Sequence, residues 1–178
     1  TAQDDYSALY IASGSNALTL TKSNFTGNIA NNKATVGIEN AKAQVNNCNF
    51  TDNEVKASGS AIYVNAQEVI ISNNIFDKNE AGANGTVYFA STSGKILNSN
   101  FTNNKALNGA GVYTGANVGI IISNSSFISN VASVEAGAIY LASQAGKIQY
   151  CNFTDNTAVN GGAVVLAGSN QEIGFCKF

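Results

Sequence analysis

The stretch Ala138-Ile139-Tyr140, followed thirteen residues after its tyrosine by Phe153-Thr154-Asp155-Asn156, decides the fold of this chain. Its second half recurs at steps of 25 or 26 residues, with phenylalanine at Phe25, Phe50, Phe76, Phe101, Phe127, Phe153 and Phe178. An asparagine stands three places after each of the first six: Asn28, Asn53, Asn79, Asn104, Asn130 and Asn156. A period of this length indicates a solenoid, in which each repeat stacks on the next.

Aliphatic residues also keep fixed places in every repeat. One column lies next to the tyrosine position and consists of Leu9, Ile38, Ile62, Val87, Val112, Ile139 and Val164. A second stands five residues before each phenylalanine: Leu20, Val45, Ile71, Ile96, Ile122, Ile148 and Ile173. Strand alternation turns both columns inward with the phenylalanines, and turns the tyrosines and the small residues before them outward. Because a separation of five breaks this alternation, we expect a bend before each phenylalanine.

These spacings favour an all-β fold. Apolar residues recur every two positions rather than every 3.6, and the intervening segments are rich in Gly and Asn, which are poor helix formers. The leucine-rich-repeat and hexapeptide patterns are both missing. The sequence therefore predicts one domain over residues 1–178, a single-stranded right-handed parallel β-helix of seven coils of 25–26 residues. Right-handedness rests on the general preference of parallel crossover connections and on the resemblance to surface proteins given below.

Composition restricts the classes of partner. The net charge is −2, only 11% of residues are charged, and all nine basic residues are lysines without a basic cluster. We therefore expect neither nucleic acid nor an anionic membrane as a partner. No run approaches the ~20 apolar residues of a membrane helix, so no direct membrane insertion is expected. Residues 1–15 lack the pattern of a signal peptide.

Two short motifs resemble those of known surface proteins. Gly161-Gly162-Ala163-Val164 and Ala136-Gly137-Ala138-Ile139, combined with the Phe-x-x-Asn repeats, resemble motifs of the chlamydial polymorphic membrane proteins. They are also similar to motifs of the adhesin-like surface proteins of methanogenic archaea. The resemblance covers essentially the whole chain. It implies an exported right-handed β-helix, displayed at the cell surface and involved in adhesion or envelope structure.

Most of the repeated polar residues have an architectural explanation. The Phe-x-x-Asn asparagines can form a ladder of hydrogen bonds between coils, and they tolerate the left-handed backbone of a tight corner. Cys48, Cys151 and Cys176 share a slot that otherwise holds Ser or Asn, so we expect buried small side chains rather than a disulfide framework or zinc site. Cys151 and Cys176 should be neighbours on adjacent coils, and the sequence does not decide whether a disulfide joins them.

Catalysis is not expected. Only one patch among the acidic residues is worth naming, where Glu54 and Glu80 share a slot beside Asp52 and Asp77, and a solvated turn explains it. Histidine and arginine are absent, which removes the usual general base and the usual clamp for acidic sugars. We therefore predict no enzyme activity, no metal and no cofactor.

Two sets of residues remain candidates for function. Tyr10, Tyr63, Tyr88, Tyr113 and Tyr140 form a broken outward stripe that either contacts a partner or simply stabilises the sheet by stacking. Six sequons make Asn24, Asn49, Asn84, Asn100, Asn124 and Asn152 candidates for N-glycosylation, although their number is close to chance for this composition.

Three functions follow, in order of preference. The first is a non-enzymatic extracellular structural protein, a subunit or segment of a cell-surface fibre, sheath or appendage. Because the repeats run in phase from residue 1 to Phe178, we expect the chain to associate with itself by head-to-tail coil stacking. The alternative is an adhesin stalk that binds surface glycans or proteins. A polysaccharide-active β-helix enzyme comes third.

Overall fold

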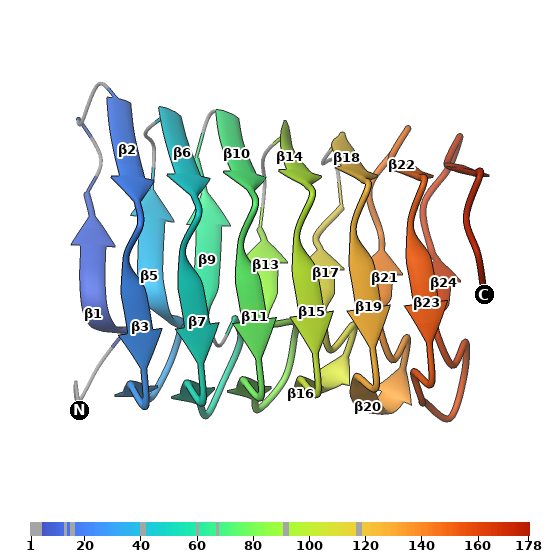
Figure 1. Cartoon of the computed structure of the whole chain (residues 1–178), viewed down its shortest axis with the longest axis horizontal. Coiled ribbons are helices and arrows are strands. Elements are labelled where there is room, and N and C mark those ends of the chain that lie inside the picture. Colours follow the sequence, from blue (N-terminus) through green and yellow to red (C-terminus); the bar gives the residue numbers. More distant parts are fainter. Residues whose placement is uncertain are drawn as a thin grey trace.

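The computed structural model describes residues 5–12, 14, 17–39, 42–59, 61–66, 68–90, 93–116 and 119–178. Strands from successive coils lie side by side along the long axis, from the N-terminal to the C-terminal end (Figure 1). The strands pair in parallel with the equivalent strands of neighbouring coils, and the described residues contain no helix. The predicted all-β parallel β-helix is confirmed.

Four parallel sheets form the walls of the solenoid. Sheet A consists of β1 (Tyr6–Ile11), β5 (Ala34–Glu39), β9 (Ile62–Asn65), β13 (Val87–Phe89), β17 (Val112–Thr114), β21 (Ile139–Leu141) and β24 (Val164–Leu166). Sheet B consists of β2 (Ala17–Thr21), β6 (Lys42–Asn46), β10 (Glu68–Ser72), β14 (Ser93–Leu97), β18 (Ile120–Ser123), β22 (Lys147–Gln149) and β25 (Glu172–Gly174). Sheet C consists of β3 (Asn24–Thr26), β7 (Asn49–Thr51), β11 (Ile75–Asp77), β15 (Asn100–Thr102), β19 (Ser126–Ile128) and β23 (Asn152–Thr154). Sheet D consists of β4 (Ile29–Ala30), β8 (Glu54–Val55), β12 (Glu80–Ala81), β16 (Lys105–Asn108) and β20 (Val131–Glu135).

The coils lose strands towards the C-terminal end. Sheets A and B each contain seven strands, one from every predicted coil, whereas sheet C contains six and sheet D five. Isolated bridges continue the pairing where strands are missing, as between Val131 and Thr157 and between Asn152 and Lys177. The described chain therefore follows the predicted coil path to its last residue, with fewer regular strands in the seventh coil.

The core is a set of stacked columns, as the spacing predicts. The seven phenylalanines stack with ring centroids 4.6–5.2 Å apart and ring planes within 11° of parallel. The inner four, Phe50, Phe76, Phe101 and Phe127, are fully buried together with the middle members of the aliphatic columns. A second, smaller cluster of alanines lies inside sheet D, where the coil is narrow: Ala81, Ala106, Ala110, Ala132 and, partly buried, Ala158.

The small residues before the tyrosines were expected to face outward, and this prediction is wrong. Ala61, Thr86 and Ala138 are fully buried, and a Cβ added to Gly111 would lie 2.9 Å from the Phe127 ring. Strand alternation begins only at the following residue, where β9, β13, β17 and β21 start. The small residue therefore lies on the corner that leads into the strand, and a corner can turn two consecutive side chains inward.

Left-handed residues make two of the corners. The expected bend before each phenylalanine is present, with φ between 49° and 56° at Lys22, Asn47, Asn73, Asn98, Asn124, Tyr150 and Phe175. A second column of positive φ holds Gly27, Asp52, Lys78, Asn103, Ser129 and Asp155. This second column lies one residue before the Phe-x-x-Asn asparagines, so the ladder asparagines do not take the left-handed conformation proposed for them. Their hydrogen bonds to neighbouring coils occupy them instead.

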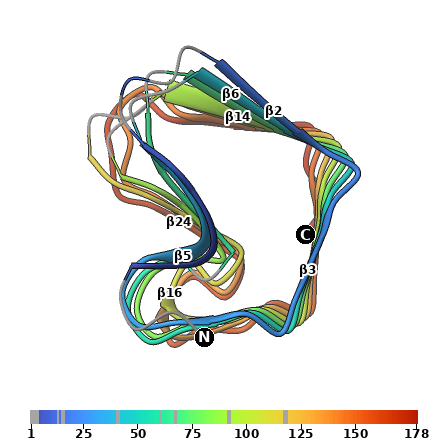
Figure 2. The same ribbon diagram turned by 90° about the vertical axis from the view of Figure 1, so that its left-hand side faces the viewer.

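The cross-section of the solenoid is not convex. Figure 2 shows the wall of β5 and β24 set inward from the outline of the coil. The chain near β16 leads into this wall. The outer face of sheet A, which carries the tyrosines, therefore lies in a recess of the coil outline. Sheets B and C form the flatter outer walls.

Candidate functional site

The predicted tyrosine stripe is a continuous stack in the middle of the solenoid. Tyr63, Tyr88, Tyr113 and Tyr140 are aligned in register on β9, β13, β17 and β21. Their ring centroids are 5.4, 5.3 and 4.9 Å apart in that order; the first two contacts are edge-on and the last is parallel. All four are half-buried rather than exposed, and burial raises the pKa of Tyr63, Tyr88 and Tyr113. The hydroxyl groups of these three tyrosines therefore stay neutral throughout the physiological range.

The turn into sheet A covers the base of this stack. Gly59, Gly85 and Gly109 have φ of 83°, 52° and 55°, and each lies against the tyrosine of the next coil. A Cβ added to Gly85 would lie 2.7 Å from the backbone nitrogen of Tyr113, and one added to Gly109 would lie 2.8 Å from the Cβ of Tyr140. Glycine is needed there both for its conformation and for the close approach. These glycines were not predicted from the sequence, although each stands three or four residues before the tyrosine of its own coil.

Tyr6 fills the gap that the sequence left in the stripe. The second coil has Gly37 where a tyrosine was expected, and a Cβ added there would overlap the Tyr6 ring. Tyr6 stacks on Tyr10 at 4.7 Å and contacts Tyr63 at 6.4 Å between centroids. The aromatic column is therefore continuous from Tyr10 to Tyr140, because a ring from the first coil replaces the missing ring of the second.

A hydrogen-bonded cluster closes the N-terminal end of this column. Tyr6 donates to Oε1 of Glu39 at 2.6 Å, and Tyr10 donates to Oε2 at 3.2 Å. Lys33 also donates to Oε1 of Glu39, at 2.9 Å, and pairs with Asp5 at 3.2 Å. The hydrogen bonds from Tyr6 and Lys33 hold the pKa of Glu39 below its usual range. Every charge in the cluster has a partner, so it stabilises the first two coils and offers no open ligand site.

The predicted asparagine ladder is present, and its four middle members are buried. From Asn28 to Asn156, each side-chain Nδ2 donates to Oδ1 of the next ladder asparagine at 2.9–3.0 Å. Each Oδ1 also accepts the backbone N–H of the preceding ladder asparagine. From Asn53 onward, Nδ2 makes a further bond to the phenylalanine carbonyl of the preceding coil. The amides therefore join neighbouring coils and are not available to a ligand.

The cysteine slot forms a second, shorter ladder. The backbone N–H of Cys48 donates to Oδ1 of Asn74 at 2.7 Å, and that of Cys151 contacts Sγ of Cys176 at 3.4 Å. Cys48 and Cys151 are buried, Cys176 is partly buried, and all three are free thiols. Burial raises the pKa of Cys151 to about 11, so it remains a thiol. The expected adjacency of Cys151 and Cys176 is confirmed.

The sequons lie on outer surfaces. Asn24, Asn49, Asn100 and Asn152 begin strands of sheet C and are exposed; Asn124 is exposed at a corner, and Asn84 is half-buried. Neighbouring members of the sheet C column contact each other, as Nδ2 of Asn49 donates to Oδ1 of Asn24 at 3.0 Å. Modification of these residues stays a prediction.

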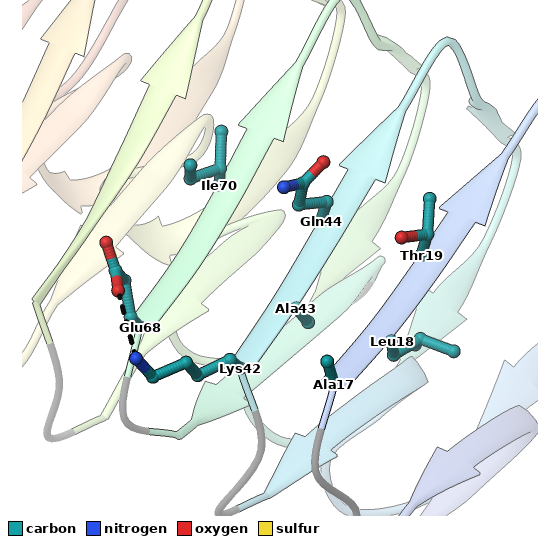
Figure 3. Close-up of a pocket in the computed structure, with 8 residues that line it drawn as sticks. All are labelled: Ala17, Leu18, Thr19, Lys42, Ala43, Gln44, Glu68 and Ile70. Carbon is teal, nitrogen blue, oxygen red and sulfur yellow. Dashed lines mark ion pairs between the residues drawn. The ribbon is translucent and has the colours of Figure 1, made fainter.

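The outer face of sheet B is hollowed. A depression of about 290 Å³ crosses β2, β6 and β10, lined by Ala17, Leu18, Thr19, Lys42, Ala43, Gln44, Glu68 and Ile70 (Figure 3). Glu68 also borders a second depression of about 150 Å³ over β14 and β18. The only ion pair that Figure 3 marks here joins Lys42 to Glu68 at 3.8 Å. The lining is mixed and shallow, and it brings no paired carboxylates together.

The acidic patch has the same modest character. Glu54 and Glu80 are in register on β8 and β12, and Asp77 accepts a hydrogen bond from Asn103 at 3.2 Å and lies 4.0 Å from the Lys78 ammonium. Across the described ranges, no group of three or more His, Cys, Asp or Glu side chains could hold a metal ion. In the same ranges, no helix is long and apolar enough to cross a membrane.

The geometry defines a class of protein: a parallel β-helix repeat protein whose repeated side chains join one coil to the next. The model of the family described as "Right handed beta helix region" matches residues 2–146. The chain belongs to this right-handed β-helix family. Comparison with curated proteins and with solved structures found no match.

Proposed function

We propose that this chain is a non-enzymatic structural segment of a cell-surface fibre, sheath or appendage outside the cell. The main support for this proposal is that the repeated polar side chains bond one coil to the next. The buried side-chain amides of Asn53, Asn79, Asn104 and Asn130 donate hydrogen bonds to the asparagines of adjacent coils. A column joined by four sheets, a phenylalanine stack and an amide ladder is suited to rigidity and repetition. The resemblance to surface proteins supports an extracellular location.

Self-association by coil stacking belongs to the same proposal. In the 178-residue chain, the apolar columns are fully buried in the middle coils but only partly buried in the first and last. Phe178 stacks on Phe153 at 4.8 Å and is 68% exposed. A second copy placed in the same register would continue the phenylalanine stack and the sheets. Such a head-to-tail contact does not close on itself and produces a filament.

Sedimentation velocity over a wide range of protein concentration tests this association. The 178-residue chain should form a concentration-dependent series of species, and Phe178→Lys should abolish it without loss of the folded CD spectrum. Ile75→Lys is the matched control, because Ile75 is 46% exposed on an outer wall rather than at a column end. A chain that stays monomeric at every concentration contradicts head-to-tail stacking.

The second candidate is an adhesin stalk, favoured by the continuous tyrosine column in the recess of sheet A. Tyr88 and Tyr113 are half-buried there, so their outer parts can contact a protein or glycan while their bases are covered by the turn glycines. Replacing both by Ser should weaken binding to a neighbouring cell or surface protein. Unchanged binding would leave the column with a stacking role alone.

We hold catalysis to be absent from this function. Glu54 and Glu80 are exposed on the outside of sheet D, and the chain has neither histidine nor arginine. Incubation with neutral and acidic polysaccharides should leave their viscosity unchanged, and a progressive loss of viscosity would establish the third candidate, a polysaccharide-active enzyme.

A further inference from the structure

An exposed aromatic pair interrupts the corner between sheets B and C. Tyr150 and Phe175 stack with centroids 4.9 Å apart and planes 7° from parallel. Tyr150 is 53% exposed and Phe175 is 78% exposed. In the preceding coils the same corner position holds Lys22, Asn47, Asn73, Asn98 and Asn124.

The backbone at this corner disfavours aromatic residues. Tyr150 and Phe175 have φ of 55° and 56°, in the left-handed region where a bulky side chain is an outlier. Asparagine tolerates this conformation because its short polar side chain bonds locally, and four coils use it. Both rings lie outside the apolar core. Strained residues of this kind concentrate at functional sites, since their conformation has to be maintained by the surrounding structure.

The pair forms a ledge beside the fifth coil. Phe175 covers one face of the Tyr150 ring, so the opposite face is directed towards the preceding coil, where Asn124 occupies the corner. The Asn124 side chain is shorter than that of tyrosine, and its Nδ2 donates to Oγ of Ser123 at 3.1 Å. The outer part of the Tyr150 ring therefore projects beyond Asn124, with a flat face open to solvent and Phe175 behind it.

The groups around this ledge are polar and mostly uncharged. Asn124, at the same corner of the preceding coil, and Asn152, two residues after Tyr150, are both exposed. The Gln149 amide donates to Oε1 of Glu172 at 3.1 Å. The charge of Glu172 is in turn paired with Lys147 at 2.9 Å. Amide side chains offer both donors and acceptors, which match the hydroxyl groups of a sugar.

We propose that the Tyr150 ledge binds a neutral saccharide, with one face of a pyranose ring stacked on Tyr150 and its hydroxyls bonded to Asn124 and Asn152. A pyranose combines a flat C–H face with a polar rim, which is the pattern that the ledge presents. A stable protein partner needs roughly 800 Å² on each side, far more than one exposed ring supplies. This site goes beyond the structural role proposed above.

The test uses the folded 178-residue chain and an array of β-linked hexasaccharides of glucose, galactose, mannose and N-acetylglucosamine. We expect binding to at least one of them, a loss of about tenfold or more in Tyr150→Asn, and affinity within a few-fold of the parent in Tyr150→Phe. Asn73→Ser, at the same corner three coils away, should bind like the parent. Because asparagine suits the left-handed corner, Tyr150→Asn should also unfold at the same temperature as the parent or higher.

Four results would overturn the proposal. Binding to none of the four hexasaccharides would remove the ligand class, and undiminished binding by Tyr150→Asn would place the site elsewhere. A lower melting temperature for Tyr150→Asn would show that the aromatic pair serves stability. Self-association that depends on Tyr150, without saccharide binding, would identify the ledge as a contact between copies instead.

Discussion

Replacing Asn104 by alanine removes one member of the buried ladder. The expected loss of stability follows from the four hydrogen bonds that the Asn104 side chain makes. Oδ1 of Asn104 accepts from the backbone and the side chain of Asn79 at 2.9 and 3.0 Å. Its Nδ2 donates to the Phe76 carbonyl at 3.0 Å and to Oδ1 of Asn130 at 2.9 Å. Asn79, Asn104 and Asn130 are fully buried. At about 1 kcal/mol for each net bond, Asn104→Ala should lower the free energy of unfolding by about 4 kcal/mol.

Urea unfolding followed by circular dichroism measures this loss, provided that the parent and the variant have similar m-values. Asn100→Ala is the control, because Asn100 is exposed at the start of β15 and its Oδ1 accepts only an exposed hydrogen bond from Ser126. The control should stay within about 0.5 kcal/mol of the parent. If Asn104→Ala were no more destabilising than Asn100→Ala, the ladder would not be what joins the coils.

Three further predictions concern the ends, the turns and the thiols. The lowered pKa of Glu39 stabilises the fold above the pKa of an unfolded glutamate, and this stabilisation is lost as pH falls through the folded pKa. The urea midpoint of the parent should therefore fall more steeply between about pH 5 and pH 3 than that of Glu39→Gln, and parallel curves would show that the cluster contributes nothing. Gly85→Ala should lower the free energy of unfolding by at least about 1–2 kcal/mol from its positive φ alone. The control Gly174→Ala should be near neutral, because its added Cβ would meet nothing closer than 3.9 Å. Equal unfolding free energies for the two variants would contradict the close packing of Gly85 against Tyr113. Cys176, which is partly exposed, should react with a thiol reagent at pH 8 well before Cys151, whose buried thiol has a pKa of about 11; equal modification rates by mass spectrometry would contradict this burial.

The sequence predicts the columns well because identical residues repeat at identical places. Phe101 has to stack on Phe76 and Phe127 once the strands are in register, and Asn104 has to meet Asn79 and Asn130 for the same reason. Such contacts need only the period and the parallel pairing. The bend before each phenylalanine also follows from counting, since a separation of five residues cannot keep both side chains inward on one straight strand.

Features that depend on corners or on exchange between coils could not be predicted from the period. Ala138 faces inward because the corner into β21 departs from strand alternation. Tyr6 replaces the ring missing at Gly37 although it belongs to another coil and another register position. The tyrosine column is half-buried because the turn at Gly109 passes over Tyr140, and only the three-dimensional path of that turn shows this. Tyr150 was not predicted as a site from the sequence, because only the backbone conformation shows that it lies at a corner.

We propose that coils of one molecule can continue those of another, as they continue within the chain. Electron microscopy and fibre diffraction of the concentrated 178-residue chain test it most directly. We expect thin unbranched filaments with a reflection at about 4.8 Å along the filament axis, because the strand spacing continues across each junction, and we expect Phe178→Lys to form none. Discrete particles at all concentrations, or filaments that persist in Phe178→Lys, would contradict it.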